Sequence, residues 1–202
     1  MIPPTLPLDF GYNFDVVVNT NNEGQGSLRQ FIINSNELNN VNLDQEDDPL
    51  GGISFPKEAG IETSLIEITS PGAQIINPLF AYDAISDSHT HVTGYTHDAS
   101  NSGPIDSRDI TIELNGGGLN FDAFDIRSNS VSISGLSVHG YRRAVNSNSN
   151  INDLHVWGNY IGVLEDGSAV PSGFGNDSNG LELRNVSDSY IGTDYDLSLI
   201  HI

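Results

Sequence analysis

The sequence predicts an all-β fold, built as a solenoid of short strands. Short apolar runs rich in β-branched residues recur along the chain, separated by Gly, Asn, Asp and Ser. The pattern Ile-x-x-Leu-x-Val-x-Gly begins at Ile133 and again at Ile151, 18 positions later. An echo of about 20 residues is typical of solenoids, in which like residues of successive coils stack. An antiparallel β-sandwich also has many short strands, but it does not account for the echo.

One helix is expected near the start of the chain. A strand at 14–18 leads into a turn-rich loop at 19–26. Ser27 is the expected N-cap of a helix over about 27–38, because Gln30 follows three residues later and an apolar stripe begins at Leu28. No second helix is expected. The other expected strands are Ile53–Phe55, Leu65–Ile68, Gln74–Ile76, His91–Thr93, Ile110–Leu114, Phe121–Ile126, Val131–Ile133, Leu136–Val138, Leu154–Val156 and Leu181–Leu183.

Strand alternation predicts which side chains enter the core. Leu136 and Val138 are expected to point inward, while Ser137 and His139 face outward. Gly140, like its counterpart in the echo at position 158, is expected at a corner where the backbone needs a positive φ.

The charge balance excludes some classes of partner. The chain has 27 acidic and 7 basic residues, for a net charge of −20. Such a charge repels nucleic acid and anionic lipid surfaces, so no nucleic-acid partner is expected. No apolar run is long enough to span a membrane. The absence of cysteine excludes disulfides and thiolate metal sites.

The two ends of the sequence differ in texture from the rest. Residues 1–13 are rich in proline and predict a linker or the tail of an upstream domain. The domain is expected over 14–196. Residues 197–202 resemble the translation of a transposon-end adaptor used in preparing sequencing libraries, so we expect a non-native scar there and a native sequence that continues beyond Asp196. The alternative is a genuine apolar final strand.

Two motifs resemble a known family. The segment from Asn19 to Gln30 reads N-T-N-N-E-G-Q-G-S-L-R-Q. It is similar to the motif that opens the right-handed parallel β-helix repeats of large bacterial surface proteins. The segment from Gly94 to Ser100 resembles that family's "G-Y-T-Q-P-G-A-S" turn, but it has His97 and Asp98 in place of Gln and Pro and is one residue shorter.

That resemblance covers about 14–194. It implies a right-handed parallel β-helix with one short N-terminal capping helix, truncated at its C-terminal end. It also implies export, an extracellular or cell-surface location, and adhesion or glycan contact. No active site is carried over with it.

Calcium is the one cofactor that the sequence suggests. Asp44, Glu46, Asp47 and Asp48 are clustered in a polar stretch, and calcium needs several oxygen ligands around one ion. Solvated surface charge is the other interpretation, and without such a site no cofactor is expected. A metal site formed by His89, His91 and His97 is a further hypothesis, because residues i and i+2 of a strand face the same way.

Aromatic residues are the candidate glycan contacts. Trp157 and Tyr141 are the two candidates, since aromatic rings stack on sugar rings, although packing in the core is the default for such residues. The sequence Tyr-Ile-Gly occurs at Tyr160 and again at Tyr190, so these two side chains are expected to stack on each other.

Three functions remain open at this point. The first hypothesis is a non-catalytic surface module for adhesion or contact with a polysaccharide or cell-surface glycan. The second is a polysaccharide lyase or glycoside hydrolase whose active coils are partly missing. Asp122, Asp125 and Asp153 could come close together for it, but no known signature selects them. The third is a structural spacer without a ligand.

Overall fold

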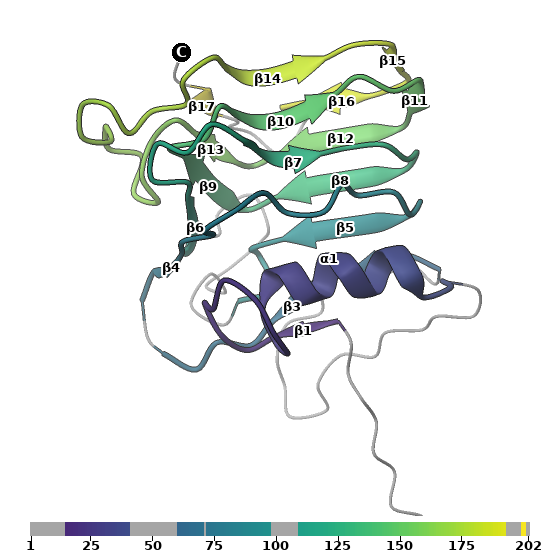
Figure 1. The fold of residues 1–202 in the computed structure, drawn as a ribbon, viewed down its shortest axis with the longest axis horizontal. Coiled ribbons are helices and arrows are strands. Elements are labelled where there is room, and N and C mark those ends of the chain that lie inside the picture. Colours follow the sequence, from purple (N-terminus) through teal and green to yellow (C-terminus); the bar gives the residue numbers. More distant parts are fainter. Residues whose placement is uncertain (1–14, 41–59, 71, 98–108, 193–198, 201–202) are drawn as a thin grey trace, which may run out of the picture.

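The computed structural model describes residues 15–40, 60–70, 72–97 and 109–192, together with the backbone of Leu199–Ile200. These residues form short β-strands and one α-helix (Figure 1). The elements are β1 (Val16–Val17), α1 (Leu28–Glu37), β2 (Glu62–Thr63), β3 (Leu65–Ile66), β4 (Gln74–Ile76), β5 (Thr90–Thr93), β6 (Ile112–Asn115), β7 (Asp122–Asp125), β8 (Val131–Ser134), β9 (Leu136–His139), β10 (Arg143–Ser147), β11 (Ile151–Asn152), β12 (Leu154–Trp157), β13 (Tyr160–Ile161), β14 (Asn179–Leu183), β15 (Val186–Ser187), β16 (Tyr190–Ile191) and β17 (Leu199–Ile200).

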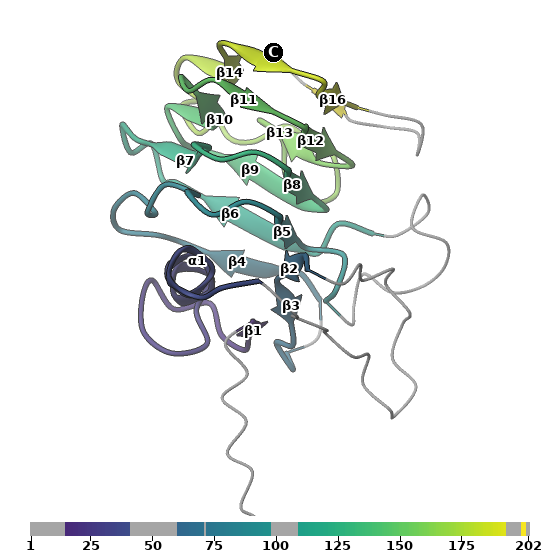
Figure 2. The ribbon, with the colours of Figure 1, turned by 90° about the vertical axis from the view of Figure 1, so that its right-hand side faces the viewer.

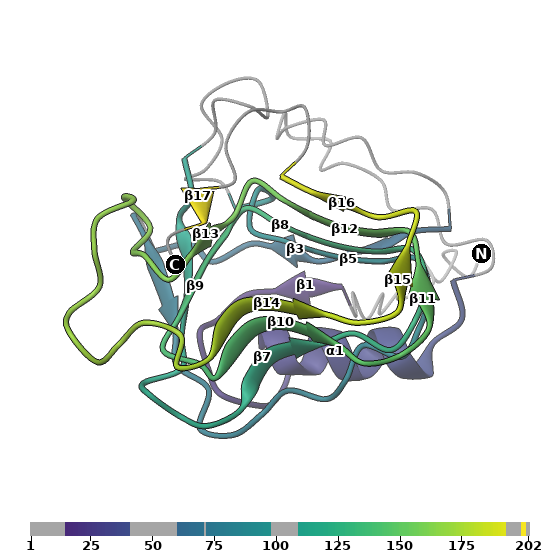
Figure 3. The ribbon, with the colours of Figure 1, turned by 90° about the horizontal axis from the view of Figure 1, so that it is seen from above.

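All pairs between these strands are parallel. Sheet 1 has the order β2-β5-β8-β12-β16, and sheet 2 has the order β4-β6-β9-β13-β17. Sheet 3 has the order β7-β10-β14, and two smaller sheets pair β1 with β3 and β11 with β15. Consecutive strands enter different sheets: β8, β9, β10 and β11 lie in four sheets, and β12 returns to pair with β8. Figure 3 shows the sheets side by side around a common interior.

The spacing of the strand pairs corrects the sequence echo. Val156 pairs with Ile133 and Ile161 pairs with Val138, so partners lie 23 positions apart rather than 18. The echo matched β8 and β9 to β11 and β12, which lie in different sheets. Similar apolar alternation in every strand produced it, so it detected the repetition and gave the wrong register.

The helix is confirmed with its cap. The side-chain oxygen of Ser27 accepts a hydrogen bond from the backbone N–H of Gln30, while the Gln30 side chain donates to Asn34 instead of returning to the cap. α1 lies at one end of the strand stack and β14–β16 lie at the other (Figure 2). Asn36 accepts from Ser86 and donates to the carbonyl of Ala84, which ties α1 to the segment beside β7.

Arg29 explains why arginine follows Ser-Leu in the N-terminal motif. Arg29 is 5% exposed, and its guanidinium donates to the carbonyls of Asn22, Phe80 and Ala81 at 2.6–2.9 Å. It also lies over the ring of Phe80, 4.0 Å from the centroid, and over that of Tyr82. Charge-assisted hydrogen bonds of this kind fasten the 79–82 segment to the helix.

The core lies between the sheets. Leu136 and Val138 point inward and are buried, as predicted, and Gly140 and Gly158 have φ of 71° and 58° at their corners. The predicted strands fall on strands of the structure to within a few residues, except Ile53–Phe55, which lies outside the described residues. The linker 1–13 also lies outside them, and of the suspected scar the structure describes only Leu199–Ile200, which pairs with β13.

Candidate functional site

The corner between sheets 1 and 2 is built around Tyr95. Its ring lies across two glycines, Gly135 after β8 and Gly158 after β12, and its hydroxyl donates to the carbonyl of Gly158 at 2.8 Å. A Cβ on Gly135 would lie 2.7 Å from Tyr95 Cγ, and one on Gly158 would lie 2.4 Å from the hydroxyl oxygen. Both glycines also have positive φ. Only glycine therefore fits beneath the tyrosine ring.

Trp157 lies on the outer side of this corner. It ends β12, pairs with Ser134 of β8 and is partly buried. Its ring stacks on Tyr95, with centroids 5.6 Å apart. Trp157 and Tyr160 pack against Tyr95 and Ile110 in a small cluster separate from the main core. We call Tyr95, Trp157 and Tyr160 the aromatic corner.

Tyr160 and Tyr190 do not stack on each other. Tyr160 pairs with Ser137 in sheet 2, whereas Tyr190 pairs with His155 in sheet 1 and makes an edge contact with its ring at 5.0 Å. The expectation from the second echo is wrong because the two Tyr-Ile-Gly segments belong to different sheets.

His91 stands beside Trp157, with ring centroids 6.3 Å apart. Its Nε2 is 2.8 Å from the hydroxyl of Ser134, which donates in turn to Thr93. Burial and the nearby charge of His155 lower the pKa of His91 to about 4, so the imidazole stays neutral at physiological pH.

The three histidines proposed as metal ligands do not converge. His97 is buried and bonds through its ring nitrogens to Thr111 and to the carbonyl of Ile68. In the part of the chain that the structure describes, no group of three or more metal-binding side chains is close enough to hold an ion. The proposed calcium ligands Asp44, Glu46, Asp47 and Asp48 lie outside that part.

A pocket of about 420 Å³ opens next to the aromatic corner. It shares Ile110 and Tyr160 with the aromatic cluster and is otherwise lined by acidic and small side chains. The remaining lining residues are Ala73, Asp109, Thr111, Glu165 and Asp166. An aromatic ring beside hydrogen-bonding groups is the combination that polar organic ligands such as sugars use.

Sheet 2 carries a buried acid–imidazole group beneath the segment 163–176. His139 is 2% exposed and Ser137 is fully buried, although strand alternation predicts that both face outward. They do lie on the outer side of β9, but the segment covers them: Ser137 donates to the carbonyl of Val163, and His139 Nδ1 is 3.2 Å from that of Phe174. A chain insertion, invisible to strand alternation, buries them.

Glu113 completes this buried group. Its Oε1 is 3.0 Å from His139 Nε2, and burial together with a hydrogen bond shared with the carboxyl of Glu165 raises its pKa. Both ring nitrogens of His139 are thus engaged, and neither is available to activate the Ser137 hydroxyl. Glu113 is only 4% exposed, whereas Glu165 also lines the 420 Å³ pocket. Glycoside hydrolysis needs two carboxyls that both reach the substrate, and the buried Glu113 does not offer that access.

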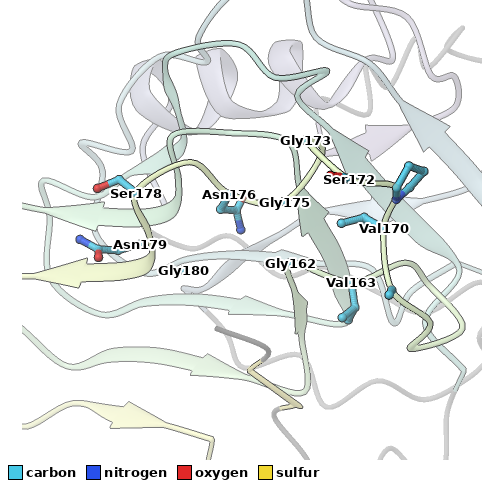
Figure 4. Close-up of a pocket in the computed structure, with 12 residues that line it drawn as sticks. Gly162, Val163, Val170, Ser172, Gly173, Gly175, Asn176, Ser178, Asn179 and Gly180 are labelled. Atoms are coloured by element: carbon cyan, nitrogen blue, oxygen red, sulfur yellow. The ribbon is translucent and has the colours of Figure 1, made fainter.

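A second pocket, of about 350 Å³, lies where the same segment returns to sheet 3. Its walls are backbone and small side chains, with Val163 and Val170 toward one end and Ser178 and Asn179 toward the other (Figure 4). None of its lining residues is ionisable, so it offers hydrogen bonds and no acid–base chemistry.

The other candidate residues are dispersed. Tyr141 is fully buried, with an edge contact to Phe121, and has no ring surface to offer a ligand. Asp122 pairs with two arginines, Asp125 with Arg127, and Asp153 lies 3.0 Å from His155 Nε2. These three carboxylates have separate partners and form no joint site.

Comparisons with family models, curated proteins and solved structures found no match to this chain. The only helix among the described residues is α1, and its 10 residues are too short to cross a membrane.

The sequence analysis selected Trp157 as a candidate glycan contact but missed Tyr95, whose only signal in the sequence was its place in the Gly-Tyr-Thr turn.

Proposed function

We propose that this chain is a right-handed parallel β-helix that serves as a non-catalytic, exported surface module, and that its aromatic corner contacts a glycan. Parallel pairing throughout, with β12 returning to β8 by way of three other sheets, supports the β-helix. The proposed handedness, export and surface location rest on the resemblance of the segment from Asn19 to Gln30 to the opening motif of bacterial surface β-helices.

The observation that carries the glycan proposal is the stacking of the Trp157 ring on the ring of Tyr95. The ring is partly exposed and rests on Tyr95, which is itself fixed by a hydrogen bond to Gly158. A ring held in advance loses little conformational entropy when a sugar stacks on it. The adjoining pocket supplies carboxylates that accept hydrogen bonds from sugar hydroxyls.

Binding of a panel of neutral and charged oligosaccharides tests this proposal. Trp157→Ala is expected to weaken binding about tenfold or more, and Trp157→Phe to retain part of it, because truncation of a tryptophan at the centre of a binding site commonly costs about 2 kcal/mol or more. Leu79→Ala is the control, since Leu79 is a 73% exposed apolar residue outside the corner.

The other two functions predict different results. New reducing ends or unsaturated products from the same oligosaccharides would indicate a hydrolase or lyase. Absence of binding to any member of the panel would leave the structural spacer. Equal loss of binding in Trp157→Ala and Leu79→Ala would also count against the aromatic corner.

A further inference from the structure

Sheet 3 carries most of the positive charge of a strongly acidic chain. Four of the seven basic residues lie on it or directly beside its strands: Arg127 follows β7, Arg142 and Arg143 stand at the start of β10, and Arg184 follows β14. The chain as a whole has a net charge of −20. This face therefore differs in charge from the rest of the molecule.

The charges on this face are layered. The side chains of Arg142, Arg127 and Arg184 are 42%, 61% and 67% exposed. Their carboxylate partners, Asp122, Asp125 and Glu182, are only 9%, 26% and 18% exposed. An approaching molecule thus meets guanidinium groups first, with the carboxylates beneath them.

A buried arginine holds the layers in place. Arg143 bridges Asp122 of β7 and Glu182 of β14 at 2.8 and 2.6 Å, across the strand between them. Hydrogen bonds from Arg142 and Arg143 lower the pKa of Asp122, and Arg143 does the same for Glu182. Both carboxylates therefore stay ionised and keep the arginines oriented.

The exposed guanidiniums come from successive strands of the stack. β10 lies between β7 and β14, and Asn146 of β10 pairs with both Asp125 of β7 and Glu182 of β14, so that Arg127 and Arg184 each follow two residues after a register partner of Asn146. Arg127 and Arg184 thus occupy the same place two strands apart, which is roughly 10 Å. Arg142 precedes β10 at the opposite end of these strands, so the exposed guanidinium groups spread over sheet 3 rather than gather around one point.

We propose that this arginine face binds a linear carboxylated polysaccharide, a polyuronate. A guanidinium presents parallel N–H donors that match both oxygens of a carboxylate, and each exposed arginine has donors left beyond its present ion pair. Guanidinium groups spread over one sheet suit a chain that carries a carboxylate on every sugar. The net charge of −20 opposes more densely charged polymers such as nucleic acid. The site does not depend on the aromatic corner, which lies between the other two large sheets (Figure 3).

Titration with an oligogalacturonate, followed by calorimetry, tests the proposal, and the methyl-esterified oligomer serves as the uncharged control ligand. The unmodified protein is expected to bind the acid form, more weakly at high salt, and not the ester. Replacing Arg127, Arg142 and Arg184 together by Gln is expected to weaken binding about tenfold, since each exposed pair contributes about 1.4- to 5-fold.

Two matched variants separate the face from net charge. The triple change Asn21→Asp, Gln25→Glu and Ser70→Asp lowers the net charge by three, as the Gln variant does, but at exposed positions away from sheet 3, and it is expected to leave binding nearly unchanged. The triple change of the same arginines to Lys keeps the charge but loses the paired donors, and an intermediate affinity is expected. If circular dichroism shows that the Gln variant does not fold, the Lys variant provides the test. A loss of affinity of about threefold or more in the Lys variant would then support binding at this face.

Four results would overturn the proposal. These are no binding of the acid form, equal binding of the ester, equal weakening by the charge-matched control, and a salt-sensitive dimer in light scattering that the Gln variant abolishes. The last would assign the face to a second copy of this chain. If the Gln variant still binds oligosaccharides in a way that depends on Trp157, the aromatic corner is a binding site independent of the arginine face.

Discussion

The two ends of the strand stack use similar residues with different results. At the α1 end, Leu28, Phe31 and Ile32 of the helix are at most 1% exposed, because they cover the first strands. At the other end, Tyr190 and Ile191 of β16 are 55% and 39% exposed. One end of the core is closed by an amphipathic helix, and at the other the described residues leave apolar groups at the surface.

This difference shows that a strand in this fold is buried by the strand beside it. Val156 and Ile191 are register partners in sheet 1, yet Val156 is 1% exposed because it has neighbours on both sides. In sheet 3, Val145 is buried in the middle strand and its partner Leu181 is only partly buried. Residue type and alternation set the direction of a side chain, while position in the stack sets its exposure.

The largest expected effect tests the closed end. Phe31→Ala removes a ring that is 1% exposed, and it is expected to lower the free energy of unfolding by about 3–5 kcal/mol. Ile191→Ala at the open end is the control, with an expected loss below about 1 kcal/mol because much of that side chain already contacts solvent. Urea unfolding of the two variants measures both, and equal losses would refute the difference between the ends.

The same distinction separates what sequence could and could not predict of the fold. The capping helix was predictable because Ser27, Gln30 and the apolar stripe after Leu28 are local signals. The register was not, since every strand has the same alternation and nothing local says which neighbour it meets. The burial of His139 could not be predicted either, because a segment inserted some 30 positions later covers it.

The candidate site divides in the same way. Trp157 was predictable as a lone tryptophan in a polar sequence. Its support by Tyr95 was not, since the two are brought together by the stacking of β5, β8 and β12. The arginine face was equally hidden, because Arg127, Arg142 and Arg184 are far apart in sequence.

The next effect, at the α1 end, depends on pH. Glu62 is 1% exposed, and its Oε2 has no hydrogen-bond partner among the described residues. Burial, a hydrogen bond with Asp15 and the charges of Asp15 and Asp87 raise the pKa of Glu62 from 4.5 to about 8. The folded protein therefore prefers the protonated form of Glu62, so the contribution of this residue to stability is fully present below about pH 4.5 and is lost as the pH rises through about 8.

Glu62→Gln is expected to remove that pH dependence and to stabilise the protein at pH 9 by about 1 kcal/mol or more, because a neutral amide replaces a buried charge. Glu182 in β14 is the opposite case, since Arg143 lowers its pKa. Its contribution is present above about pH 4.5 and is lost as the pH falls through its lower folded pKa. Thermal unfolding of Glu62→Gln and Glu182→Gln from pH 3 to 9 compares them, and parallel curves would contradict both assignments.

The smallest effect on stability, at the open end, concerns association. β14, β15 and β16 each have a described neighbour on one side only, and such edges pair with other chains unless a charge or a cover prevents it. We expect concentration-dependent self-association of this chain in light scattering. Ile191→Lys is expected to reduce it with a stability change below about 1 kcal/mol, while Val18→Lys, at a 51% exposed position near α1, leaves it unchanged.

The direction of this last result is informative because long-range charge opposes it. Each lysine moves the net charge from −20 to about −19, which weakens the repulsion between copies and by itself favours association. A decrease in Ile191→Lys but not in Val18→Lys therefore reports a local contact at the β16 edge. A monodisperse monomer at every concentration would show instead that the edge is protected, and the exposure of Ile191 would then have no consequence for assembly.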